Sequence, residues 1–213
     1  MQFDSIVFDL DGTLWDTTPA CAVAWNSVLQ RNGLAFREIT ADDVRQVTGK
    51  PHDDCIRLTF EGFPEHELQA VIDQTAVEDN VAIARMGGTL YPGVGEGLPL
   101  LAERFPLFIV SNCQEGYIET FLSFTGFGSY FQDFECFGNT GRPKSENLSR
   151  VIDRNGLQAP IMIGDAEGDE VAARACGVPF ILASYGFGRG IAPDHVCHSF
   201  RDLTEFLLQP MTN

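Results

Sequence analysis

The chain of 213 residues lacks the features that mark several protein classes. It has no apolar run long enough to span a bilayer, and its first residues lack the basic and apolar regions of a secretory signal, so we expect a cytoplasmic protein. Its six cysteines include no CxxC pair, which predicts reduced thiols rather than a disulfide framework. No internal repeat or low-complexity segment is present, which excludes repeat architectures.

Basic residues are also scarce. Fourteen lysines and arginines stand against 30 aspartates and glutamates, giving a formal net charge of −16. Because such a field repels phosphate backbones, we expect neither nucleic acid nor an anionic membrane as a partner. A small phosphorylated substrate would then need a local positive site, made by a metal ion or a few basic side chains. The hydrophobic content of 44% is that of an ordinary globular protein with a buried core.

Two aspartates follow an apolar run near the start of the chain, in the stretch Ile6-Val7-Phe8-Asp9-Leu10-Asp11-Gly12-Thr13. The run predicts a buried strand, and strand alternation places Asp9 and Asp11 on the same side of the chain. Neighbouring carboxylates repel each other unless a cation or a proton lies between them, and Mg²⁺ prefers such hard oxygen ligands. A strand running into an Asp-Gly turn would explain the stretch equally well, so its interpretation depends on the downstream sequence.

Helical patterns fill the next segment, and no convincing strand is found between residues 16 and 85. Four helices are expected there, over residues 19–32, about 40–49, around 55–58 and about 64–85. The last should bury an apolar face made of Leu68, Val71, Ile72, Ala76, Val77 and Val81. The pattern predicts a helical insert after the first strand.

Strands and helices alternate from residue 87 onward. Apolar strands are expected at residues 107–111, 134–137, 161–165 and 178–182, with helices at 98–105, 117–124, 145–155, 169–176 and 203–208. Apolar strands separated by helices indicate a parallel sheet covered on both faces. We therefore predict an α/β fold with a parallel-sheet, Rossmann-like three-layer core over residues 1–15 and 87–213, and a helical-bundle cap domain over residues 16–86.

Polar residues end three of the predicted strands. In parallel sheets, ligands bind beyond the carboxyl ends of the strands. That rule places five residues at one edge of the sheet: Asp9, Asp11, Ser111, Asn112 and Asp165. Capping alone explains such a convergence poorly, so the pattern favours a functional site.

Four segments of the chain resemble, in order and spacing, the motifs of the haloacid dehalogenase superfamily: Asp9-Leu10-Asp11-Gly12-Thr13, Ser111-Asn112, Pro143-Lys144 and Gly164-Asp165-Ala166-Glu167-Gly168-Asp169. The helical insert resembles that family's cap, so the resemblance covers essentially the whole chain. With an aspartate at position 11 the chain resembles the phosphatase branch of the family (phosphoglycolate phosphatase and β-phosphoglucomutase-like proteins), because true dehalogenases lack an aspartate there. The resemblance implies a Mg²⁺-dependent phosphatase that hydrolyses a small phosphomonoester through an aspartyl-phosphate.

The resemblance also implies catalytic roles. Asp9 would attack phosphorus as the nucleophile, and Asp11 would act as general acid and then as general base. Lys144 would balance charge on the nucleophile and on the transferring group. Many family members carry lysine directly before proline, where this chain has Arg142, so Arg142 could serve the same electrostatic purpose.

Ligand contacts follow from the same resemblance. Ser111 and the backbone N–H of Asn112 would hold phosphoryl oxygens, and Thr13 would either orient Asp11 through its hydroxyl group or cap a turn. The Mg²⁺ ligands would be Asp9, the main-chain carbonyl of Asp11, Asp165 and Asp169. Asp169 has an alternative role, because acidic residues favour any helix N-terminus.

The predicted cap has two features that bear on specificity. Lys50 and His52, a basic pair at a helix junction, are expected to contact the leaving group of the substrate. The four histidines show no metal-ligand spacing and are otherwise expected at the surface. Residues 14–18 and 86–93 would be the hinges of the cap. The glycine-rich segment 186–190 does not match a dinucleotide site.

Two other functions use similar residues. A phosphosugar mutase would keep the same core and the same aspartyl-phosphate, and the cap would decide between the two reactions. A phospho-accepting signalling module of the receiver type also has an acidic metal site, but it is about half this length and needs no helical cap. The sequence leaves open the physiological substrate and the choice between a monomer and a homodimer.

Overall fold

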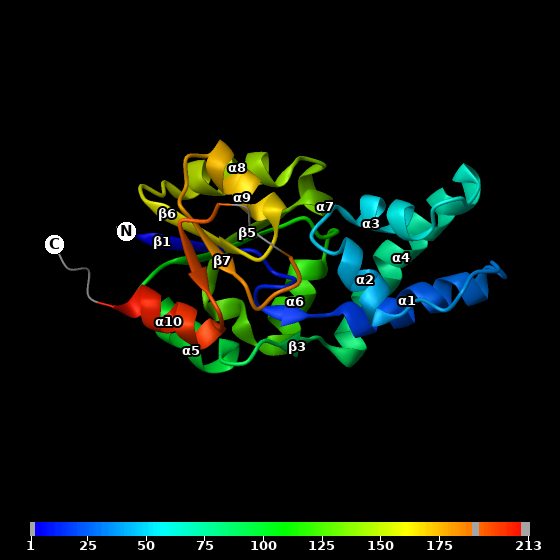
Figure 1. The fold of residues 1–213 in the computed structure, drawn as a ribbon, viewed down its shortest axis with the longest axis horizontal. Helices are drawn as coiled ribbons and strands as arrows, with labels where there is room; N and C mark the ends of the chain where they lie inside the picture. Colours follow the sequence, from blue (N-terminus) through cyan, green and yellow to red (C-terminus); the bar gives the residue numbers. More distant parts are fainter. Residues whose placement is uncertain (1–2, 189–191, 210–213) are drawn as a thin grey trace.

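The computed structural model describes residues 3–188 and 192–209, and a parallel sheet with helices on both faces makes its larger part (Figure 1). The strands are β1 (Ser5–Phe8), β2 (Trp15–Asp16), β3 (Thr89–Leu90), β4 (Leu107–Ser111), β5 (Phe131–Cys136), β6 (Pro160–Gly164), β7 (Phe180–Ala183) and β8 (His195–Cys197). The helices are α1 (Thr18–Arg31), α2 (Ala41–Val47), α3 (His52–Thr59), α4 (Glu65–Met86), α5 (Val94–Ala102), α6 (Tyr117–Thr125), α7 (Phe137–Thr140), α8 (Lys144–Asn155), α9 (Glu167–Ala175) and α10 (Phe200–Leu208), with one 3₁₀ turn, η1 (Phe127–Ser129).

The main sheet has six strands in the order β5-β4-β1-β6-β7-β8, and all its neighbouring strands are parallel. β1 lies in the middle and is buried along its whole length. Its side chains alternate between two apolar clusters, because Ile6 and Phe8 pack on one face of the sheet and Val7 on the other. The predicted α/β fold with a parallel sheet is confirmed.

Two groups of helices cover the sheet. Leu148 of α8 and Ala173 of α9 belong to the cluster around Val7. Helices α5, α6 and α10 supply apolar side chains to the other cluster, and Figure 1 shows them on the opposite face. Because both faces are covered, the carboxyl ends of the strands form the open edge of the core.

Helices α1–α4, here called the helical insertion, extend beyond that edge (Figure 1). β2 and β3, which flank the insertion, pair with each other as a two-stranded antiparallel ribbon with Trp15 opposite Leu90. The two predicted hinge segments are therefore hydrogen-bonded together. No helix in the described ranges is long and apolar enough to cross a membrane.

The buried face of α4 differs from the prediction. Leu68, Val71 and Ile72 are buried as expected, but Val77 and Val81 are 66% and 55% exposed. The buried stripe instead continues through two polar residues, Thr75 and Asp79, and through Ala82 and Ile83. The prediction selected the wrong face because it followed the apolar residues alone. The buried face keeps the 3.6-residue period of the helix, and at some of its positions polar side chains contact partners inside the insertion.

Several element boundaries also differ. α5 begins at Val94, after Gly93 in a left-handed conformation (φ 95°), so Pro99 lies inside the helix rather than near its start. β5 begins at Phe131, three residues earlier than expected, and Phe137 starts the short helix α7. The three-residue strand β8 had no sequence signal, since it is too short for an alternation pattern.

Candidate active site

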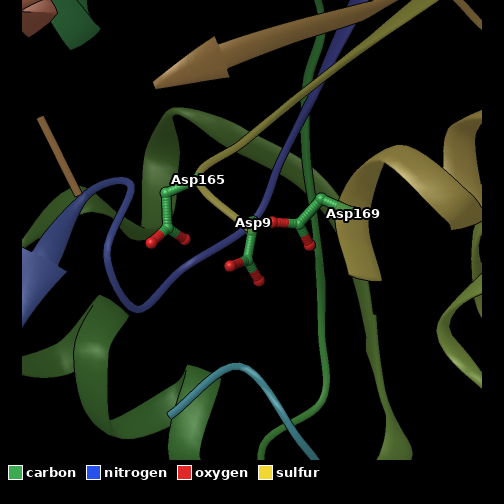
Figure 2. Close-up of side chains that lie close together, drawn as sticks. All are labelled: Asp9, Asp165 and Asp169. Atoms are coloured by element: carbon green, nitrogen blue, oxygen red, sulfur yellow. The ribbon is translucent and has the colours of Figure 1, made fainter. Parts of the chain in front are cut away.

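Three aspartates meet at the open edge of the sheet (Figure 2). Asp9 follows β1, Asp165 follows β6, and Asp169 lies in the first turn of α9. One carboxylate oxygen from each lies within 4.8 Å of the other two, and each residue is at most 2% exposed. The carboxyl-end rule predicted Asp9 and Asp165 at this edge, and the family resemblance predicted Asp169 beside them.

Lys144, the first residue of α8, is the cation of this cluster. Its Nζ donates to Asp9 Oδ1 at 2.7 Å and to Asp169 Oδ1 at 2.6 Å, and the residue is only 5% exposed. Burial alone would lower the pKa of Lys144, but Asp169 and Asp9 more than offset this and raise it. The side chain of Arg142 is 54% exposed and pairs with Glu146. The structure therefore brings Lys144, and not Arg142, to the aspartates.

The cluster has a surplus of negative charge. Burial, and next the charge of Asp169, raise the pKa of Asp9 to about 7, although Lys144 opposes the shift. The same two causes raise the pKa of Asp165 to about 7. Three ionised carboxylates and one ammonium group would carry a net charge of −2. A divalent cation with a preference for oxygen ligands fits this donor set in charge and in chemistry.

Glycines permit the close approach of these groups. A Cβ atom at Gly12, whose φ is +83°, would collide with the carboxyl group of Asp165, and one at Gly164 would collide with that of Asp169. Any side chain at these positions would push the aspartates out of place. The Asp-Gly turn after the first strand is therefore part of the site itself.

A loop after β7 fixes Asp165, whose Oδ2 accepts hydrogen bonds from the backbone N–H groups of Phe187 at 2.7 Å and Gly188 at 2.8 Å. The sequence of segment 186–190 did not predict this contact, because the segment was weighed only as a dinucleotide site; its last two residues lie outside the described ranges. A Cβ atom at Gly186 would collide with the carbonyl oxygen of Gly12 and with Asp165. The glycines of this segment were therefore the feature of the sequence that could have indicated a close contact with the site.

Asp11 is held apart from the cluster by two hydroxyl groups. Its Oδ1 accepts hydrogen bonds from Tyr117 at 2.7 Å and from Thr17 at 3.0 Å. Burial raises the pKa of Asp11 to about 7, while the hydrogen bond from Tyr117 opposes the shift. The expected contact from Thr13 is not made, since its buried Oγ1 has no hydrogen-bond partner among the described residues. Sequence analysis missed Tyr117, which lies 106 positions from Asp11 and carries no local signal.

The two predicted phosphate-binding residues lie at the end of β4: Ser111 is its last residue and Asn112 follows it. Ser111 is 3% exposed, and its Oγ accepts a hydrogen bond from the backbone N–H of Cys113 at 3.3 Å. The side-chain amide of Asn112 donates to the carbonyl oxygen of Gly49 at 2.9 Å. Asn112 therefore links the sheet edge to the loop between α2 and α3.

A small cavity of about 60 Å³ lies between the sheet edge and the helical insertion. Asp9, Asp11, Ser111 and Asn112 line it from the core, and Lys50, which is exposed, lines it from the insertion. His52 lines it as well and is only 8% exposed, so the expectation of a surface histidine was wrong. The structure thus brings both predicted cap residues to the cavity.

Comparison with known proteins agrees with this geometry. The family model for haloacid dehalogenase-like hydrolases matches residues 6–183. The chain belongs to this family. Relatives named phosphoglycolate phosphatase include one from Nitrosococcus oceani, 28% identical over 98% of both chains, and one from Rhodobacter capsulatus, 32% identical over 86% of this chain and 85% of that protein.

Solved structures of haloacid dehalogenase-like proteins share the fold. A predicted phosphoglycolate phosphatase from Haemophilus somnus superposes with a TM-score of 0.85, at 23% identity over 97% of this chain and 99% of that chain. A haloacid dehalogenase-like family protein from Streptococcus pneumoniae superposes with a TM-score of 0.84, at 19% identity over 96% and 98%. The family model and the named relatives confirm the predicted enzyme class, a haloacid dehalogenase-like hydrolase of the phosphatase type.

Proposed function

We propose that this haloacid dehalogenase-like hydrolase is a Mg²⁺-dependent phosphatase that cleaves a small phosphomonoester through an aspartyl-phosphate on Asp9. The observation that carries the proposal is the buried contact of Lys144 with Asp9 and Asp169, with Asp165 within ligand distance of both. A carboxylate placed beside a buried cation and an acidic metal site is suited to attack phosphorus.

The residues divide the reaction into two steps. Asp9 attacks phosphorus, the ester P–O bond breaks, and Asp11 donates a proton to the leaving alkoxide. Asp11 then takes a proton from water, which attacks the phosphoryl group, releases inorganic phosphate and regenerates Asp9. Lys144 keeps Asp9 ionised and oriented through its hydrogen bond to Oδ1.

Four groups would hold Mg²⁺, which supplies positive charge against the phosphate when bound: Asp9, the main-chain carbonyl of Asp11, Asp165 and Asp169. Ser111 and the backbone N–H of Asn112 would hold phosphoryl oxygens on the other side of Asp9. The position of all these residues at one strand edge supports this assignment.

We further propose that the helical insertion acts as a cap, with the domain boundaries predicted above, and that it excludes bulk water when closed. The support is the cavity that the insertion and the sheet edge enclose together. The partner would be a small phosphorylated metabolite, as the phosphoglycolate phosphatase names of the relatives suggest.

Release of inorganic phosphate from p-nitrophenyl phosphate tests the proposal, measured with Mg²⁺ and with EDTA. Wild-type turnover should require Mg²⁺, and Asp9→Asn should lower it about a thousandfold or more because the nucleophile is lost. Asp153→Asn is the matched control, since Asp153 is an exposed aspartate on α8. Asp11→Asn should retain a phosphoryl group on the Asp9 peptide, detectable by mass spectrometry. Turnover that persists in Asp9→Asn would disprove the proposal, and phosphate transfer to a sugar without release would indicate a mutase.

A further inference from the structure

A buried carboxyl group of the helical insertion lines the cavity without a full set of partners. Asp79 of α4 is 2% exposed. Its Oδ2 accepts a hydrogen bond from Trp25 Nε1 at 3.3 Å and lies 3.5 Å from His52 Nδ1. Its Oδ1 has no hydrogen-bond partner among the described residues. Because a buried, unsatisfied polar atom is costly, this oxygen requires an explanation.

The neighbours of His52 decide where its protons lie. His52 Nε2 is 2.9 Å from Thr75 Oγ1 and 3.3 Å from the carbonyl oxygen of Ile72. The Thr75 hydroxyl donates to the carbonyl oxygen of Val71 at 2.7 Å, so both neighbours of Nε2 act as acceptors. Nε2 therefore carries a hydrogen, and Nδ1 faces Asp79 Oδ2.

The 3.5 Å separation of His52 Nδ1 and Asp79 Oδ2 fits an arrangement in which one of the two groups carries a proton that faces the other. Burial raises the pKa of Asp79 to about 8, opposed by the hydrogen bond from Trp25, and burial lowers the pKa of His52. The pair is therefore net neutral and offers no positive charge to a ligand. In both proton arrangements Oδ1 is an acceptor, and Asp79 is one of the residues that line the cavity.

The rest of the cavity also disfavours an anionic leaving group. Asp11 lies close enough for its charge to raise the pKa of Asp79. Lys144 is engaged by Asp9 and Asp169, and among the described residues that line the cavity the exposed Lys50 is the only lysine or arginine, against the three aspartates Asp9, Asp11 and Asp79. A carboxylate placed beside Asp79 would meet an acceptor oxygen and the nearby carboxyl group of Asp11.

We propose that Asp79 Oδ1 accepts a hydrogen bond from the leaving group, so that the preferred substrate is the phosphate ester of a small alcohol that bears a hydroxyl or ammonium donor. This inference rests on the proposed phosphatase function and distinguishes the chain from its relatives named phosphoglycolate phosphatase, since glycolate carries a carboxylate. The cavity of about 60 Å³ that Asp79 lines is small, which suits the small alcohols compared below.

Four esters of nearly equal size test the proposal with the wild-type enzyme: 2-aminoethyl phosphate, 2-hydroxyethyl phosphate, n-propyl phosphate and phosphoglycolate. The kcat/KM of at least one donor-bearing ester should exceed that of n-propyl phosphate about tenfold or more, because a site built to accept a hydrogen bond rejects the analogue without the donor. The comparison of the two donors separates a hydroxyl from an ammonium preference. Phosphoglycolate or n-propyl phosphate matching the better donor ester would overturn the proposal.

Substitution of Asp79 tests the same preference from the protein side. Asp79→Leu removes the acceptor and should make n-propyl phosphate a better substrate than 2-hydroxyethyl phosphate. Asp79→Asn replaces one oxygen by a donor and should reduce the preference for 2-hydroxyethyl phosphate over phosphoglycolate about tenfold or more. Asp73→Asn, an exposed aspartate of the same helix, should leave both ratios unchanged. Ratios that do not change in either Asp79 variant would overturn the proposal, and if Asp79→Leu fails to fold, Asp79→Asn and the wild-type series decide.

Different results would disprove the phosphatase function and the role of Asp79. Absence of Mg²⁺-dependent turnover of every ester and of p-nitrophenyl phosphate by folded wild-type enzyme would remove the phosphatase function itself. Turnover of p-nitrophenyl phosphate without a preference among the four esters for a donor would remove only the role of Asp79.

Discussion

The sheet edge and the inner face of the helical insertion both bury aspartates, but they compensate them differently. At the edge, Asp9 and Asp169 share Lys144, and Asp165 accepts two backbone N–H groups. In the insertion, Asp79 has a neutral donor, Trp25, and a histidine that shares a proton with it. The difference indicates two kinds of ligand.

A cluster of carboxylates around one ammonium group keeps a net negative charge and fits a divalent cation with its phosphate. A single carboxyl group in a net-neutral pair instead fits one hydrogen-bond donor. Asp9 of the sheet edge and Asp79 of the insertion line the same cavity, so the two sites would take the two ends of one substrate. The following predictions test whether the two regions are as different as their contacts indicate.

The largest effect is expected from Lys144→Met. Removing this cation leaves buried carboxylates without their partner, which typically costs about 3–5 kcal/mol of unfolding free energy. Urea unfolding at neutral pH in EDTA measures the loss, and saturating Mg²⁺ should restore part of it if the aspartates bind the ion. Arg142→Met is the control, because an exposed ion pair is worth about 0–1 kcal/mol. Equal unfolding free energies of the two variants would mean that Lys144 stabilises the sheet edge no more than Arg142 stabilises the protein surface.

That contrast between Lys144 and Arg142 also marks the limit of sequence analysis. The residues at strand ends, Asp9, Ser111 and Asp165, were predictable because the strand period and the carboxyl-end rule are local and topological. Lys144 came from a family resemblance, which could not by itself exclude Arg142; its contacts at the sheet edge were needed to distinguish the two residues.

The inner face of the insertion was not predictable in the same way. Apolar periodicity selected Val77 and Val81, yet α4 turns Asp79 inward because Trp25 and His52 complete it from other helices. Tyr117 likewise reaches Asp11 through tertiary structure alone. Long-range polar pairs leave no pattern in a single sequence, whereas the parallel core does.

The second prediction concerns pH and Asp79→Asn. Burial raises the pKa of Asp79 in the folded protein from 3.8 to about 8, so the folded state holds this proton more tightly than the unfolded state. The contribution of Asp79 to stability is therefore fully present below pH 4 and is lost as the pH rises toward 8, at a slope of at most about 1.4 kcal/mol per pH unit. Asparagine does not titrate, so Asp79→Asn should gain stability relative to wild type over this range.

Urea unfolding of both proteins between pH 5 and pH 7.5 measures this difference. His52 acts in the opposite direction, since burial lowers its pKa, but it is present in both proteins. Asp73→Asn is the control on the same helix and should run parallel to wild type. Parallel curves for Asp79→Asn and wild type would show that folding does not raise the pKa of Asp79.

A smaller effect is expected from Tyr117→Phe. The substitution removes one of the two hydroxyl groups that hold Asp11 and leaves Thr17 in place. A hydrogen bond to a charged group contributes about 1.5–3 kcal/mol. Because the bond positions Asp11, the proposed acid and base, its loss should lower kcat about tenfold, the lower end of that range, while KM changes little. Tyr130→Phe is the control, because Tyr130 packs on Phe127 by its ring. A change confined to KM would place Tyr117 in substrate binding instead of in the positioning of Asp11.

The smallest effect is expected from Asn112→Ala, which keeps the backbone N–H proposed to hold phosphate and removes only the side-chain bond to Gly49. That bond joins the two regions at the cavity, so its loss should raise KM for the best ester up to about fivefold, the value of one neutral hydrogen bond, with kcat nearly unchanged. Asn80→Ala removes a similar bond, from Asn80 Nδ2 to the carbonyl oxygen of Glu115 at 2.8 Å, between two residues that do not themselves line the cavity. If both variants raise KM equally, the link at Gly49 serves general docking of the insertion; a larger effect of Asn112→Ala shows that the two sites must be held in register to bind one substrate.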